Sequence, residues 1–197
     1  PLLASHGDRD DVIPLAVGTD SRLLSAIGPG MLWVVVLLFG MLVTFRATSL
    51  DSGPLRDLTT LAGLDPAAAF LGRALASAVL LLALVVTLTP VMIVLYAPPA
   101  ITGWPSLVGL AVAGAVGLAM IGALAGALVS GLRTRTALAP LLVAPLSIPV
   151  LLAATAGTDL VLSGRSNIRW LLLLVAMDLA IAIVGVLLAG PLHDTAT

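Results

Sequence analysis

Five long apolar runs constrain the fold of this chain more than any other feature. A helix needs about 20 apolar residues to cross the roughly 30 Å hydrocarbon core of a bilayer, and each run is about that long. Backbone amides and carbonyls cannot stay unpaired in lipid, and the runs lack the alternation of a barrel strand, so the spans must be helical. We expect an all-α polytopic membrane bundle of five transmembrane helices. The runs are 27–45, 74–96, 107–132, 137–156 and 170–190.

The composition indicates a single membrane domain. Of the 197 residues, 60% are hydrophobic and 10% are charged, which leaves too little polar surface for a soluble fold. The chain has no lysine, so it lacks the P-loop residue of an ATPase, and any ATP must be hydrolysed by a partner. It has no cysteine and therefore no thiol redox or thiolate metal chemistry. A net charge of −1 excludes nucleic acid as a partner.

Polar stretches divide the chain further. Residues 1–26 form a polar leader without the order of a signal peptide, 27–190 form a transmembrane permease domain, and 191–197 form a tail. Inside the domain, 47–66 stays polar and carries a leucine at every third position, which predicts a short amphipathic helix on the membrane surface. We expect Asp65 to cap the membrane helix that follows.

Arginine placement orients the chain. Five arginines lie beside 47–66 or in the loop after the third run, against four on the opposite side, so the positive-inside rule places 47–66 in the cytoplasm. This segment is then open to a cytoplasmic ATPase, with polar and apolar side chains as candidate contacts. These candidates are Asp51, Gly53, Leu55, Arg56, Asp57 and Leu58.

Prolines make the fourth run unusual, because each one removes a helical hydrogen bond. Pro145 and Pro149, with Ser147 between them, predict one of two things. One is a static kink relieved by neighbours or by the serine. The other is a bendable element beside a substrate path, since broken helices mark such paths in transporters.

Three further features of the runs suggest packing or function. Asp178 lies within the last run, where an aspartate costs about 2.5–3.5 kcal/mol, so it should face protein or water, either as a functional group or as a neutral structural residue. Gly122 and Gly126 share a helix face that packs within the bundle or forms a seam between two protomers. Trp33 follows a turn-prone sequence and is expected to anchor at the membrane interface.

Six segments together resemble one family, the CcmB permease subunit of the cytochrome c maturation haem exporter. The most specific is the proline-containing segment LVAPLSIPVL. In order, the segments are 14–18, 27–33, 51–55, 73–90, 131–133 and 142–151.

The resemblance implies an ABC-2-like permease in the bacterial inner membrane, itself non-catalytic. Its expected partners are a separate CcmA-like ATPase, CcmC-like and CcmD-like membrane subunits and, indirectly, the haem chaperone CcmE, within a homodimer or hetero-oligomer surrounded by lipid. ATP hydrolysis would drive haem export or release of the haem-loaded chaperone. No cofactor is expected to stay bound, and no metal, with haem as the species transported or handled.

The chain departs from the family pattern in two places. Family members have a sixth membrane helix and a basic lead-in where 1–13 is polar, and they tend to carry glutamate where this chain has Arg56 and Asp57. Two alternatives remain open. One is an ABC-2-type exporter of another small hydrophobic molecule. The other is an intramembrane lipid-modifying enzyme, which would need an aspartate-rich metal motif that the spacing of Asp51 and Asp57 does not provide.

Overall fold

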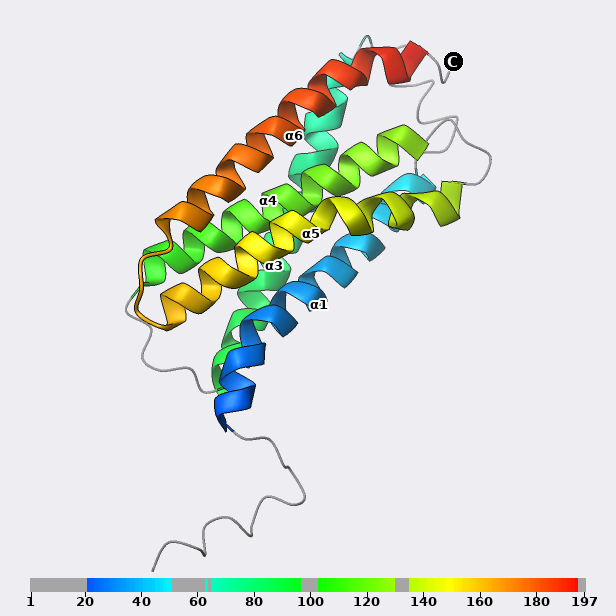
Figure 1. The fold of residues 1–197 in the computed structure, drawn as a ribbon. Coiled ribbons are helices and arrows are strands. Elements are labelled where there is room, and N and C mark those ends of the chain that lie inside the picture. The colour runs from blue at the N-terminus through cyan, green and yellow to red at the C-terminus, as the bar shows by residue number, and fades with distance from the viewer. Residues whose placement is uncertain (1–20, 51–62, 64, 97–102, 130–134, 195–197) are drawn as a thin grey trace, which may run out of the picture.

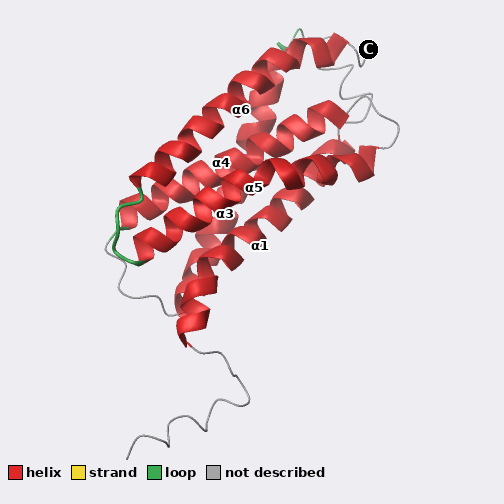
Figure 2. Ribbon diagram, in the orientation of Figure 1, coloured by secondary structure: helices red, strands yellow, loops and turns green. Residues whose placement is uncertain are grey.

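The protein is built from long helices. The computed structural model describes residues 21–50, 63, 65–96, 103–129 and 135–194. Within these residues the regular structure is entirely helical, which confirms the predicted all-α bundle (Figures 1 and 2). The helices are α1 (Ser21–Leu50), α3 (Pro66–Tyr96), α4 (Trp104–Val129), α5 (Arg135–Leu162) and α6 (Ile168–Asp194).

Each apolar run corresponds to one of these helices. Four of them contain an apolar segment long enough to span a membrane: Pro66–Val94, Trp104–Leu128, Val143–Leu162 and Ile168–Ala189. The described apolar part of α1, Ile27–Val43, is shorter, although α1 as a whole has 30 residues. A helix of that length extends about 45 Å, which is more than the thickness of the hydrocarbon core. The chain is a multi-pass membrane protein.

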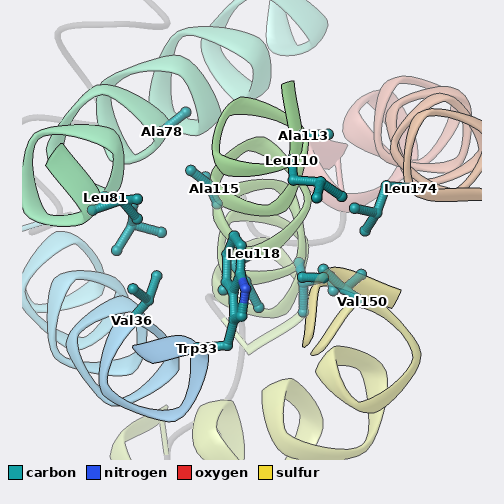
Figure 3. Close-up of a cluster of buried hydrophobic side chains, with 14 of the residues drawn as sticks. Trp33, Val36, Ala78, Leu81, Leu110, Ala113, Ala115, Leu118, Val150 and Leu174 are labelled. Atoms are coloured by element: carbon teal, nitrogen blue, oxygen red, sulfur yellow. The ribbon is translucent and has the colours of Figure 1, made fainter. Parts of the chain in front are cut away.

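Helix α4 occupies the centre of the bundle. It contacts each of the other four described helices, and the view along the bundle shows it surrounded by α1, α3, α5 and α6 (Figure 3). Three of its glycines, Gly109, Gly114 and Gly117, help to explain this position, because a side chain of another helix lies against each of them. Leu171 of α6 lies against Gly109, and Trp33 of α1 lies against Gly114. The central helix can therefore be approached closely from several sides.

The start of α3 agrees with the sequence analysis. The Oδ1 atom of Asp65 accepts a hydrogen bond from the amide of Ala67 at 3.4 Å, as an N-cap should. Gly63 has a φ of 64°, the left-handed conformation typical of a glycine that ends a helix. The predicted surface segment 47–66 starts too early, because residues 47–50 form the end of α1; residues 51–62 and 64 lie outside the described residues.

Two helix boundaries differ from the prediction. α1 begins at Ser21 and continues through Pro29, so the turn expected at 27–30 is wrong. α5 continues to Leu162 instead of ending near residue 156. The polar residues that ended the apolar run do not end the helix, and the Thr158 hydroxyl finds a partner within it by donating to the carbonyl of Ala154 one turn earlier.

A glycine ends α5. Gly164 has a φ of 69°, its amide donates to the carbonyl of Val161, and the amide of Arg165 donates to the carbonyl of Leu160. These two bonds form a Schellman motif, in which a left-handed glycine satisfies the last carbonyls of a helix. The turn is short, so α5 and α6 lie side by side in the bundle (Figure 1).

Candidate functional site

The predicted ATPase-docking segment joins α1 to α3. Its six candidate residues, Asp51, Gly53, Leu55, Arg56, Asp57 and Leu58, lie outside the described residues. The structure describes what they connect. α1 precedes these residues and ends at Leu50, and α3, whose first turn is capped by Asp65, follows them. A displacement of the segment would therefore act directly on two long helices of the bundle.

The proline-rich part of α5 is helical throughout. Pro145 and Pro149 lie one turn apart on an exposed face of α5, whereas Ser147 faces inward and is completely buried. The Ser147 hydroxyl donates to the carbonyl of Ala144 at 2.8 Å, which is not one of the carbonyls that lose their helical partner to these prolines. The helix is unbroken at these positions, and a gating role for them stays a prediction.

Asp178 faces the place where α4, α5 and α6 meet. Its Oδ1 atom is buried, and among the described residues it has no hydrogen-bond partner. The carboxyl group lies beside the backbone of Gly117. A Cβ atom added to Gly117 would lie 2.5 Å from Oδ1 of Asp178 and 3.3 Å from Cγ1 of Val150. Only a glycine at position 117 leaves room for this carboxyl group.

The predicted glycine pair lies on α4. Gly122 is buried and Gly126 is half-buried, so both lie at least partly within the bundle. Their neighbours Ile121 and Ala125 belong to the main apolar core. The described chain thus already packs around this region. Contact with a second protomer through the pair stays a prediction.

The sequence predicted that Trp33 anchors the chain at the membrane interface, but the structure buries this side chain within the bundle. Its side chain is 2% exposed, and Nε1 donates to Oγ1 of Thr158 on α5 at 3.1 Å. The indole ring fills the space above Gly114 of α4, where a Cβ atom would collide with it. Because α1 begins at Ser21, more than three turns precede the tryptophan and carry it into the bundle (Figure 3). We call this contact between α1, α4 and α5 the Trp33 joint.

A second aromatic contact lies in the opposite half of the bundle. Phe70 of α3 is 2% exposed, and the tip of its ring rests on Gly185 of α6, where a Cβ atom would collide with it. Leu124 of α4 and Ala189 of α6 complete the cluster, which is separate from the main core. We call this contact between α3, α4 and α6 the Phe70 joint. The sequence analysis missed it.

No cluster of metal ligands is present among the described residues. That part of the chain contains no group of three or more histidine, cysteine, aspartate or glutamate side chains that could hold a metal ion. What the described chain offers is close packing around α4, two aromatic joints and one buried carboxyl group.

Comparison with known proteins decides the family. The family model described as "CcmB protein" matches residues 11–191. The chain belongs to the CcmB family. The match covers α1, α3, α4 and α5 in full and α6 as far as residue 191, so it includes both joints.

A curated relative agrees with this assignment. The heme exporter protein B of Haemophilus influenzae is 34% identical over 147 residues, which is 73% of this chain. The aligned part spans 65% of that relative's length.

Proposed function

We propose that this chain is the membrane subunit of a bacterial haem exporter complex in the inner membrane, in which a separate ATPase subunit supplies the energy. The observation that carries the proposal is the family match over residues 11–191, since a curated relative in that family is named a heme exporter protein. The composition supports the division of labour. Without lysine the chain cannot form a P-loop, so a second chain has to hydrolyse ATP.

The ATPase docks on the segment 47–66. Asp51, Arg56 and Asp57 offer charged contacts, Gly53 allows close approach of the backbone, and Leu55 and Leu58 offer apolar contacts. This placement is supported by the arginine distribution and by the connection of the segment to α1 and α3. A docked subunit that moves on ATP binding would pull on both helices.

The output of the cycle is haem export or release of a haem-loaded chaperone. The partners are a CcmA-like ATPase, CcmC-like and CcmD-like membrane subunits and a CcmE-like haem chaperone. This chain acts as the mechanical element between ATPase and chaperone and holds no stable cofactor. Its closely packed bundle, in which glycines leave room for neighbouring side chains, supports a role in transmitting movement.

The docking segment gives a direct test of the proposal. The double substitution Arg56→Glu and Leu58→Asp reverses one charge and buries another in the apolar contact, so we expect the ATPase subunit to be lost from the purified complex. The matched control is Arg165→Glu, which reverses a charge at the opposite end of the bundle. ATPase recovery is measured by co-purification, and cytochrome c maturation is measured in cells. Normal recovery with the double variant would contradict docking at 47–66.

A further inference from the structure

We infer that Phe70 transmits movement of the docking segment to α6 and α4, and is therefore a positioning residue for the transport cycle. The inference rests on the proposed function, because it assumes that an ATPase acts on 47–66. It goes further by naming the side chain through which that action enters the bundle.

Phe70 lies in the first turns of α3, immediately after the docking segment. Asp65 caps this helix, and its carbonyl also accepts the amide of Ala69 at 3.0 Å, so the chain is regular from its first turn. A regular helix passes a push or a tilt at its end to the side chains of its first turns.

The contacts of Phe70 lead to two other helices. The ring tip sits in the notch at Gly185 of α6, and its other buried neighbours are Leu124 of α4 and Ala189 of α6. Ile181 of α6 packs against this cluster and also against the main core around α4. A shift of the ring therefore moves α6 directly and reaches the main core through Ile181.

Among the described residues at this end of α3, Ala67 also packs against the cluster, but it is small and only partly buried. Residues 66–73 are all described, and Phe70 is the only one of them that is buried. Leu71 beside it is 42% exposed. The other buried member of the first turns, Ala74, is small. The ring is also held by shape alone, because phenylalanine has no polar atom, so it can tilt in the notch without breaking a hydrogen bond.

The test separates ATP hydrolysis from the work it drives. The complete complex with its ATPase is reconstituted in lipid, and ATP hydrolysis and release of haem-loaded chaperone are measured together. With Phe70→Ala we expect unchanged recovery of the ATPase and near-normal hydrolysis, but a release per ATP about fivefold or more below that of the parent protein. Phe70→Leu, which refills most of the space, should restore much of the release. Leu71→Ala, on the exposed side of the same turn, should behave like the parent protein.

A second variant covers the case in which Phe70→Ala does not assemble. Gly185→Ala keeps the phenylalanine but adds a Cβ atom where the ring tip now rests, so the ring must shift and release per ATP should also fall. Unchanged release per ATP in an assembled variant, or hydrolysis and release that fall in proportion, would overturn the inference. Absence of ATP-dependent release by the parent complex would instead contradict the proposed function, and this is seen before any variant is made.

Discussion

The Trp33 joint and the Phe70 joint both lodge an aromatic ring against a glycine, yet they connect the bundle differently. Trp33 links α1 to α4 and α5 and is fixed by a directional hydrogen bond to Thr158. Phe70 links α3 to α4 and α6 through apolar contact alone. Only α4 takes part in both. The joints therefore sort the outer helices into two pairs, α1 with α5 and α3 with α6, on either side of a shared central helix (Figure 3).

This difference suggests a division of labour within one bundle. A hydrogen bond is lost when its partners tilt, whereas apolar contact is non-directional and tolerates small rotations. We therefore expect the α1 and α5 pair to keep its arrangement during the cycle while the α3 and α6 pair adjusts. The Phe70 joint also lies in the half of the bundle where the docking segment enters α3, so the more adaptable contact is the one nearer to the proposed source of movement.

The largest effect is expected from filling the notch of the Trp33 joint. Gly114→Leu places a branched side chain where the indole ring lies, and overpacking of this kind costs about 1–3 kcal/mol or more. The control is Gly72→Leu, since a Cβ atom there has nothing within 4 Å. The stability of the two variants is measured as the midpoint of unfolding when purified protein in mixed micelles is titrated with sodium dodecyl sulfate. Equal midpoints for the two variants would show that Trp33 can vacate its notch freely.

A smaller effect is expected from removing only the hydrogen bond. Thr158→Val keeps the shape of the side chain but removes the acceptor of the Trp33 N–H, and such bonds between membrane helices are worth about 0.6 kcal/mol on average. Thr87→Val is the matched control. Thr87 also donates to the carbonyl one turn earlier, that of Ala83, but it is exposed on α3. The same unfolding titration should give the larger shift for Thr158→Val. Equal shifts would mean that the hydrogen bond to Trp33 adds nothing and that the two joints are alike.

The sequence predicted the helices well because membrane helices are selected by hydropathy. Length and apolarity identified the five runs, and the Asp65 cap was also correct. The errors fall where a helix continues through residues that are polar or typical of turns. Gly28 and Pro29 suggested a turn, yet α1 runs through them. The threonines near the end of α5 lowered its hydropathy, yet the helix continues, and the Thr158 hydroxyl is satisfied by a carbonyl of its own helix.

The joints could not be predicted because each depends on which helices become neighbours. An isolated tryptophan near the start of an apolar run is typical of an interfacial anchor, and only the early start of α1 and the notch at Gly114 bury Trp33. Nothing local distinguishes Phe70 from other apolar residues of α3. A weak signal was available in Gly185, a glycine between two valines near the end of α6. Such a glycine indicates close approach by a neighbour but does not say which one.

The central claim is that force enters this bundle from the cytoplasm through 47–66, and labelling of Leu55→Cys tests it most directly. The chain has no cysteine of its own, so the introduced thiol is its only target for a membrane-impermeant maleimide, and labelling is read on this chain. We predict labelling in inverted membrane vesicles, protection when the ATPase subunit is bound, and no labelling in intact spheroplasts. Labelling from outside in intact spheroplasts would place the segment on the wrong face of the membrane and contradict the account.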